Sequence, residues 1–570
     1  MLIADPVKDF YRKILHERVL LLVALDVDAL AACKILQALF KSDHVQYTLV
    51  PVENQVDVEK AFNDHKDQYN NVIMLNCGGN IDLLEILEPP DEVTIYVIDS
   101  HRPVDLVNFY CERQVYLLMK HEHDELAAIP DYDDLYKEED SDAEKDSGAE
   151  SDDPTQQSSK RRRFDEDVLE KRRERRHWEE KRKEILFEYE EFSYNGTSVA
   201  LLMYELAWKM SKDNNDTLWW GIIGVTDQFQ NKKIGRDKYV SSVLELQGHM
   251  SRLNHRFEDE ENSTSINCMK INFEHDLDVA LYRHWSLFES LCHSPSTATV
   301  FKVWTNNGMK RLHQFLAEMG IPLTQCKQNY NFMDTKVREN LPSLVEEAAQ
   351  KFGLTNIRYQ SFSAQFGYNH KMCASDMVYS VSAILENDET ENEETCNNFV
   401  DALDALSKIN SESLIKGIKL AKEQLEAMKN HVSSFIDIGQ VMSYGPFLYS
   451  YVKEGGPDVK YFSHPIYLNY FTHHLLHSYL RSLGKTKRDK AKNLPLVMCA
   501  PLNAEQGLSI LIGVPPLAED SRKNLFGRAF LHSAERTNSQ TAHDYFDPCI
   551  MTLKTEDRSK FLDALITIMS

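Results

Sequence analysis

Acidic residues follow two apolar segments of the chain, at the point where each segment ends. Asp26 and Asp28 come directly after the run Val19–Leu25, and the tripeptide Asp99–His101 follows the run Val93–Ile98. The carboxyl ends of parallel strands meet at one crevice of a sheet, and carboxylates gathered there can hold metal ions that activate water for attack on phosphorus. The spacing therefore predicts a metal and phosphate site at one edge of a parallel sheet.

The elements that must position these residues alternate regularly through the first 120 residues. Apolar runs indicate strands, and helical periodicity indicates the segments between them. Strands are predicted at 18–25, 45–52, 71–76, 93–98 and 114–119, and helices at 28–40, 56–65 and from 81. After an insertion, a helix capped within 195–198 and a buried apolar helix, 218–226, lead to Asp227. This order implies βαβ crossovers and a mostly parallel α/β sheet.

The insertion carries much of the net charge of −25. Residues 121–160 contain 15 acidic and 3 basic residues, a net charge of −12, with few apolar side chains in the acidic stretch. Such a segment cannot bury enough apolar surface to offset its ordering entropy, so 124–158 is predicted to be disordered. Its simplest role is a solvated spacer, and phosphorylation at Ser141 or Ser147 is the alternative.

The sign of the charge reverses directly afterwards. Residues 160–183 carry 12 basic and 7 acidic residues, including the runs Lys160-Arg161-Arg162-Arg163 and 171–176. The segment 160–192 lacks Gly and Pro and pairs charges at i,i+4, which predicts a helix. The basic runs are typical of a nuclear import signal. A plain solvated helix and a DNA-binding helix are the alternatives.

Composition excludes several classes of protein. Ten cysteines are scattered without a Cys-x-x-Cys pair, which argues against a disulfide framework or a zinc site. The longest apolar run near the N-terminus is about seven residues, too short for a membrane span, and it lacks the flanks of a signal peptide. The chain is therefore expected to fold in a reducing compartment, the nucleus, without a membrane.

The order of the acidic motifs resembles that of the DHH phosphoesterases, which include RecJ exonuclease and the manganese pyrophosphatases. Asp26 and Asp28 match the first motif, and Asp227 matches the late aspartate. Asn76 stands where the metal-bridging Asp would be, and Asp99–His101 stands where Asp-His-His would be. In that family the acids and histidines hold two Mn²⁺ or Mg²⁺ ions.

Two departures from the family pattern affect the chemistry. Asn76 carries no charge to bridge two cations, and Ser100 is a poor ligand where an imidazole nitrogen is expected. The site is therefore predicted to be vestigial, with no catalytic residues, metal or cofactor, and the chain to be a pseudoenzyme. A purely structural alternative is that Asp28 caps the following helix.

A closer resemblance covers almost the whole chain and is carried by short strings of residues. It is to the cell division control protein 45 family, eukaryotic relatives of RecJ. The strings lie at 26–30, 33–40, 44–51, 100–104, 196–198, 218–220, 226–228, 284–286, 445–449 and 526–530. The resemblance implies a non-catalytic subunit of the replicative CMG helicase, required for initiation and elongation of DNA replication and for assembly of the pre-replicative complex. The implied partners are the MCM hexamer, the GINS tetramer, initiation factors, polymerases and, weakly, single-stranded DNA.

The resemblance and the residue patterns together predict an α/β fold with three parts: a DHH-type domain with a mostly parallel sheet, an all-helical inserted middle domain, and a C-terminal DHHA1-like α/β domain. The predicted ranges are 1–232, 233–385 and 398–570, with an acidic linker at 386–397.

Two sets of residues are candidates for contacts. Arg528 could contact phosphate, and Lys485, Lys487 and Arg488, within the basic stretch 481–492, could contact single-stranded DNA. A structural role for Arg528 and an exposed basic loop are the alternatives. Trp285 and Trp304 could anchor a protein partner or fill the helical core.

Two other functions are possible. The first is an active divalent-metal phosphodiesterase or 5′-exonuclease that uses Asp26, Asp28, Asp99, His101 and Asp227 with an altered metal set. Asn76 and Ser100 argue against it. The second is a nuclear scaffold that acts through the acidic tract, in which deletion of 124–158 would abolish partner binding.

Overall fold

The structure is a computed structural model of the 570-residue chain. It describes all residues except 121–122, 137–157, 259–268, 367–369, 388–394, 408–410, 457, 504, 518–522 and 543–544. The chain divides into two compact units, one formed by Met1–Met119 with Ser193–Ser570 and the other by Lys120–Phe192.

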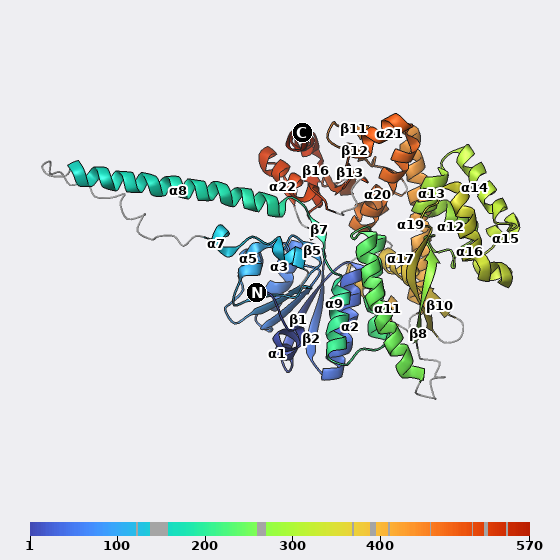
Figure 1. The fold of residues 1–570 in the computed structure, drawn as a ribbon, viewed down its shortest axis with the longest axis horizontal. Helices are drawn as coiled ribbons and strands as arrows, with labels where there is room; N and C mark the ends of the chain where they lie inside the picture. The colour runs from blue at the N-terminus through green and yellow to red at the C-terminus, as the bar shows by residue number, and fades with distance from the viewer. Residues whose placement is uncertain are drawn as a thin grey trace. The chain divides into compact units, whose positions relative to one another are not determined.

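A five-stranded parallel sheet forms the base of the first unit (Figure 1). Its strands, in spatial order, are β2 (Gln46–Val52), β1 (Arg18–Ala24), β3 (Asn71–Leu75), β4 (Thr94–Ile98) and β6 (Val115–Leu117). Every residue of β1 after the first is buried, as expected for a strand covered on both faces. The predicted α/β fold with a mostly parallel sheet is confirmed.

Helices flank this sheet, and two short strands form a separate two-stranded sheet. A π-helix at Pro6–Tyr11 precedes the α-helices. The α-helices are α1 (Arg12–Ile14), α2 (Val27–Asp43), α3 (Gln55–His65), α4 (Leu83–Leu87), α5 (Leu106–Tyr110), α9 (Val199–Lys209) and α10 (Asn215–Gln230). β5 (His101–Arg102) pairs antiparallel with β7 (Tyr194–Asn195), so the chain before and after the insertion meets beside the predicted site.

The middle of the chain is mostly helical, but it also contains a sheet. β8 (Met269–Leu277), β9 (Arg358–Phe366) and β10 (His370–Cys373) form three antiparallel strands in the order β10-β9-β8. The prediction of an all-helical middle domain is wrong in this respect. Met269 pairs with Phe366, so the sheet depends on contacts between segments far apart in the sequence, which local periodicity does not reveal.

Helices connect β8 to β9 and enclose a separate apolar core. They are α12 (Leu287–His293), α13 (Pro295–Phe301), α14 (Asn306–Glu318), α15 (Leu323–Lys327), a 3₁₀ turn at Tyr330–Phe332 and α16 (Thr335–Phe352). α11 (Arg236–Glu258) precedes β8.

Two helices after β10 pack onto the first core. α17 (Ala374–Leu385) and α18 (Thr395–Ala405) contribute buried residues to the cluster that includes β1 and α2. Glu386, the first residue of the predicted acidic linker, is buried, and its carboxylate accepts hydrogen bonds from the backbone N–H groups of Ile466 and Tyr467. Most of the linker lies outside the described residues, and the proposed domain boundaries remain predictions.

The C-terminal part is a second α/β layer, built on a mixed six-stranded sheet. Its strands are β11 (Met442–Ser443), β12 (Leu448–Tyr451), β13 (Leu496–Asn503), β14 (Leu508–Val514), β16 (Ile550–Lys554) and β15 (Thr541–Ala542), in that order. Its helices are α19 (Ser411–Ile438), α20 (Pro465–Ser482), α21 (Lys485–Ala491), α22 (Phe526–Thr537) and α23 (Arg558–Met569), with 3₁₀ turns at Val459–Ser463 and Thr555–Asp557.

Successive residues of β13 join two different apolar clusters. Met498 belongs to the cluster with α19 and α20, whereas Val497 and Cys499 belong to the cluster with α22 and α23. The sheet is therefore covered by helices on both faces, as the period-two alternation of a strand requires.

The described residues of the second unit form three helices. They are α6 (His123–Ala127), α7 (Tyr132–Leu135) and α8 (Ser158–Glu190). The predicted basic helix is confirmed, and Arg175 Nε lies 3.1 Å from Glu179 Oε1 as an i,i+4 pair. The predicted disorder of 124–158 is wrong for α6 and α7, which are helical, and Leu135 on α7 is buried. Residues 137–157 lie outside the described residues.

Gly224 in α10 allows three helices to meet beside the parallel sheet. A Cβ atom at this position would lie 2.5 Å from Ala200 Cβ in α9 and closer still to Asp28 Oδ1 in α2. Hydrogen is the only side chain that fits without displacing the backbone of a neighbouring helix.

We expect Gly224→Ala to lower the free energy of unfolding by about 1–3 kcal/mol, because overpacking displaces α9 or α2. Chemical denaturation measures this change. Gly248→Ala in exposed α11 is the matched control, since no atom lies within 4 Å of its added Cβ. The control should be neutral or stabilising, because alanine favours a helix over glycine. Equal effects of the two substitutions would contradict the close approach.

Candidate functional site

Asn76 connects the ends of β1, β3 and β4. Its Nδ2–H donates to Asp26 Oδ2 at 2.9 Å, and its Oδ1 accepts from the backbone N–H of Ser100 at 3.0 Å and the Ser100 hydroxyl at 2.7 Å. Its backbone is left-handed, with φ of 55°, a conformation that asparagine tolerates better than most residues. The nitrogen and the oxygen of the buried Asn76 amide are thus both hydrogen-bonded within the protein.

Asp26 and Asp28 have different roles at the start of α2. Asp26 is the N-cap, and its Oδ1 accepts from the Ala29 N–H at 2.7 Å. Asp28 points instead at the start of α9, where its carboxylate accepts from Ser198 Oγ–H at 2.6 Å, Val199 N–H at 2.9 Å and Ala200 N–H at 3.0 Å. The suggestion that Asp28 caps α2 is therefore wrong: Asp26 has that role.

Burial raises the pKa of Asp28 to about 6, and the charge of Asp26 adds to the shift. The three donors at the start of α9 act in the opposite direction, because they stabilise the carboxylate. Burial and the charge of Asp26 therefore outweigh the three hydrogen bonds, and the pKa of Asp28 is raised overall.

Asp99 and His101 form a buried pair. His101 Nδ1 lies 2.7 Å from Asp99 Oδ1, and Asp99 Oδ2 accepts from the Gly79 N–H at 2.8 Å. Burial alone would raise the pKa of Asp99, but His101 and the backbone donors lower it overall. Burial would lower the pKa of His101, but Asp99 and then Asp547 raise it overall. The pair therefore favours an imidazolium beside a carboxylate.

Asp227 lies near the end of α10 and is 1% exposed. Its Oδ1 accepts from Asn231 Nδ2–H at 2.8 Å, and its Oδ2 lies 3.8 Å from Lys233 Nζ. Burial raises its pKa to about 7; Lys233 opposes this shift, while Asp26 and Asp28 add to it. Burial would lower the pKa of Lys233, but Asp26, Asp227, Asp28 and Asp547 raise it overall.

Sequence reasoning missed two residues of this site, Lys233 and Asp547. Lys233 follows the end of α10 and is separated from Asp227 by only five residues, a signal that could have been read. Tertiary contacts on either side of Asp547 bring it to the site. Asn80 Nδ2–H donates to the Phe546 carbonyl at 2.7 Å, and Ser193 Oγ lies 3.1 Å from Cys549 Sγ. Residues 545–549 thereby reach the edge of the parallel sheet.

The side chains do not fit the two metal ions that the DHH resemblance implies. Among the described residues, only Glu274, Asp276 and Cys373 place three such ligand atoms within 4.8 Å of one another. The strand-end acids and His101 do not meet this condition, and Asn76 and Ser100 are bonded to each other instead. No step of chemistry through bound metal follows from this arrangement.

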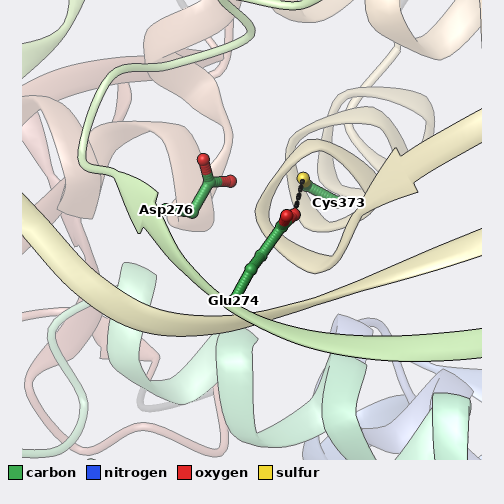
Figure 2. Close-up of side chains that lie close together, drawn as sticks. All are labelled: Glu274, Asp276 and Cys373. Atoms are coloured by element: carbon green, nitrogen blue, oxygen red, sulfur yellow. Dashed lines mark hydrogen bonds between the residues drawn. The ribbon is translucent and has the colours of Figure 1, made fainter. Parts of the chain in front are cut away.

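Glu274, Asp276 and Cys373 lie close together between β8 and the end of β10 (Figure 2). Arg283 already supplies their positive charge: its guanidinium lies 2.8 Å from Asp276 Oδ2 and 3.5 Å from Glu274 Oε1. Lys371 Nζ lies 2.6 Å from Glu274 Oε2. This group is an ion-paired cluster, in which arginine and lysine satisfy the acids.

A cleft runs between the parallel sheet and the C-terminal layer, with about 570 Å³ of space that is partly open to solvent. Polar side chains line much of it, including His101, Arg102, Lys232, Lys233 and Asp547. His101, which is paired with Asp99, joins this cleft to the strand ends. Among the described residues, no helix has the length and apolar character needed to cross a membrane.

The predicted basic residues lie elsewhere. Arg528, on α22, is half-buried, and its Nε–H donates to His532 Nε2 at 3.1 Å. Lys485, Lys487 and Arg488 lie on α21. Arg528 and the α21 residues do not line the described cleft.

The structure brings further positive charge towards α21. Lys302 is the C-cap of α13, which packs against α14 and α20, and α20 in turn packs against α21. Burial lowers the pKa of Lys302, and the charges of Arg488, Arg481 and Arg311 lower it further. We name the group Lys302, Arg311, Arg481 and Arg488 the basic surface.

The two predicted anchor tryptophans are half-buried against the chain itself. Trp285 stacks on His293 at 4.9 Å between ring centroids, and Trp304 packs against the core beneath α20. Both positions fit the alternative that these rings fill the interior. Lys160, Arg161, Arg162 and Arg163 lie within α8.

The parallel sheet with acids at its strand ends, joined to a second α/β layer, defines a mixed α/β protein. A sequence model of the CDC45 family matches residues 19–568, and the chain belongs to that family. It is 49% identical to the human cell division control protein 45 homolog over 574 residues, covering 100% of both chains.

More distant relatives agree with this assignment. The Schizosaccharomyces pombe cell division control protein 45 homolog is 29% identical over 620 residues, covering 96% of this chain and 95% of that protein. The crystal structure of CDC45 from Entamoeba histolytica superposes with a TM-score of 0.69 at 20% identity, covering 100% of both chains, which confirms the fold.

The raised pKa of Asp227 predicts a pH dependence of stability. Its pKa is about 7 in the folded chain and 3.8 in its ordinary state, so folding takes up a proton between these values. The free energy of unfolding should therefore fall as the pH rises from about 4 to 7. Asp227→Asn should flatten this dependence by up to about 1.4 kcal/mol per pH unit.

Urea denaturation across this range measures the two slopes. The difference should be clearest between about pH 5 and 6, where folded Asp227 is almost fully protonated and an unfolded aspartate is ionised. Asp28 is present in both proteins, so its own titration does not create the difference. Identical slopes for wild type and variant in that interval would contradict the assignment.

Proposed function

We propose that this chain is a non-catalytic subunit of the replicative helicase, acting with the MCM hexamer and the GINS tetramer in DNA replication. Membership of the CDC45 family supports a role in replication, and its curated relatives are named as cell division control proteins. The chain braces the helicase through protein surfaces and contacts single-stranded DNA weakly. Initiation factors and polymerases are further partners in this proposal.

The hydrogen bonds of the Asn76 side chain support a non-catalytic role most directly. Its oxygen accepts two hydrogen bonds from Ser100, and its nitrogen donates to Asp26. A bridging carboxylate would instead offer lone pairs to two cations. Because Asn76 and Ser100 hydrogen-bond to each other, neither side chain is available as a metal ligand. The edge of the sheet is held by hydrogen bonds and has little capacity to bind a metal ion that would activate water.

The basic surface is the part of the chain that best suits a nucleic-acid backbone. Clustered Lys and Arg side chains bind phosphates by releasing counterions, and the overall net charge of −25 keeps such binding weak and local. Lys302, the C-cap of α13, is near enough to arginines on α14, α20 and α21 for their charges to lower its pKa. We favour this surface over Arg528, whose side chain is held by His532.

Nuclear import through Lys160–Arg163 is also part of the proposal. These residues begin near the first turn of α8, next to the acidic stretch. A short run of lysine and arginine is the kind of sequence that import receptors recognise.

We expect the purified chain to release no nucleotides from 5′-labelled single-stranded DNA in Mn²⁺ or Mg²⁺, and to enter a complex with purified MCM and GINS proteins. Gel analysis of the DNA and size-exclusion chromatography of the mixture measure the two results. Metal-dependent cleavage that disappears in an Asp26→Ala, Asp28→Ala variant would show that the chain is a phosphodiesterase. Failure to enter the complex would contradict the assembly role.

We expect Arg481→Glu with Arg488→Glu to weaken binding to an oligothymidylate by roughly tenfold or more at low salt, because phosphate contacts are lost and repulsion is added. The dependence of log K on log salt should become shallower by about 1.4, or 0.7 for each lost contact. Fluorescence anisotropy measures both. Lys60→Glu on α3 with Lys66→Glu at its C-cap changes the net charge equally and should leave binding nearly unchanged. Equal losses in both variants would exclude a local DNA surface.

A further inference from the structure

We infer that Lys233 is the resident cation of the strand-end carboxylates, and that its ammonium group neutralises the charge that divalent ions neutralise in DHH enzymes. The residues of the site do not accommodate the metal pair, but they retain Asp26, Asp28 and Asp227. A side-chain cation in their midst explains how the fold keeps these acids buried together.

The end of α10 places Lys233 next to Asp227. The helix ends at Asn231, Lys232 turns the chain back with a left-handed φ of 61°, and the next residue is Lys233. Lys232 N–H donates to the Phe229 carbonyl and Lys233 N–H to the Gln228 carbonyl at 2.8 Å. These two bonds form a Schellman motif, which returns the chain across the last turn of the helix and fixes the position of Lys233.

The carboxylate nearest to Lys233 is otherwise incompletely satisfied. Asp227 Oδ2 is buried and has no hydrogen-bond partner, and Lys233 Nζ lies 3.8 Å from it. A buried, unpaired carboxylate oxygen is costly, so a compensating cation is required. The Lys233 side chain is 20% exposed and is the charged group that the structure places closest to this oxygen.

The surroundings of Lys233 provide further negative charge from three other elements. Asp26 and Asp28 approach from the end of β1 and the start of α2, and Asp547 from the segment before β16. The C-terminal end of α10 adds the negative pole of the helix dipole. Three other positive groups face this region. His101 is paired with Asp99, Arg102 donates to the Asp99 and His101 carbonyls at 2.9 Å, and Lys232 lies over the Phe229 ring at 5.4 Å.

Lysine suits this position because its ammonium is a compact point charge on a flexible stem. It can stand among several carboxylates without the fixed ligand geometry that a transition metal requires. A divalent cation entering the same space would meet the ammonium as a like charge. Lys233 therefore both stabilises the acids and disfavours metal uptake. This role concerns charge balance within the chain and does not depend on binding to MCM or GINS.

The experiment compares the full chain with Lys233→Met and, as matched control, Lys232→Met. Both variants lose one positive charge at adjacent positions that line the same cleft. Melting temperatures are measured in metal-free buffer and with millimolar Mn²⁺, and Mn²⁺ binding is followed by calorimetry. We expect Lys233→Met to lower the melting temperature by about 5 °C, because it leaves the acids uncompensated, and Mn²⁺ to restore part of the loss.

Wild type and Lys232→Met should show neither Mn²⁺ stabilisation nor stoichiometric Mn²⁺ uptake. The inference is overturned if Lys233→Met melts like Lys232→Met in both buffers. Stoichiometric uptake by the wild type, equal to that of Lys233→Met, would also overturn it.

A double variant covers the case in which Lys233→Met does not fold. Asp227→Asn with Lys233→Met removes the lysine and the carboxylate nearest to it together. We expect the double variant to recover folding, or a higher melting temperature than Lys233→Met alone, because the uncompensated charge is gone. A double variant that is no more stable than the single one would mean that Lys233 acts by packing rather than as a counter-ion.

Discussion

Buried carboxylates at the carboxyl edge of the parallel sheet are the constraint on which much of this structure depends. Each one must be neutralised or hydrogen-bonded inside the protein, since an isolated buried charge is very costly. Asp28 is satisfied by three donors at the start of α9, Asp99 by His101 and the Gly79 N–H, and Asp227 by Asn231 and Lys233. These contacts join segments that are far apart in the chain, so they determine how the helices pack around the sheet.

A second consequence concerns the difference between a metal site and a hydrogen-bonded one. An asparagine has both a donor and an acceptor, so Asn76 can connect Asp26 to Ser100 without any ion. A carboxylate at that position would add a negative charge to a group that already raises the pKa of Asp28 and Asp227. The substitution thus reduces the charge and supplies the donor that the edge needs. The proposed role as an assembly subunit fits a site that is satisfied without metal.

The same physical solution occurs away from this edge. Asp276 and Glu274 are compensated by Arg283 and Lys371, as the strand-end acids are by Lys233 and His101. In both places a lysine, arginine or histidine side chain lies beside a group of acidic side chains that would otherwise attract cations from solution. Both groups of acidic residues therefore form ion pairs within the chain.

The sequence by itself determined the parallel sheet, the acids at its strand ends and the basic helix, because these follow from local apolar periodicity and from residues adjacent to strand ends. It also identified Asn76 and Ser100 as departures from a metal site, since their side-chain chemistry is visible in the sequence. Only the tertiary structure decided that Asp28 binds the start of α9, that residues 545–549 bring Asp547 to the site, and that β8 pairs with β9. Those contacts join segments separated by long stretches of chain, and local patterns contain no information about which distant partner a side chain or strand will meet.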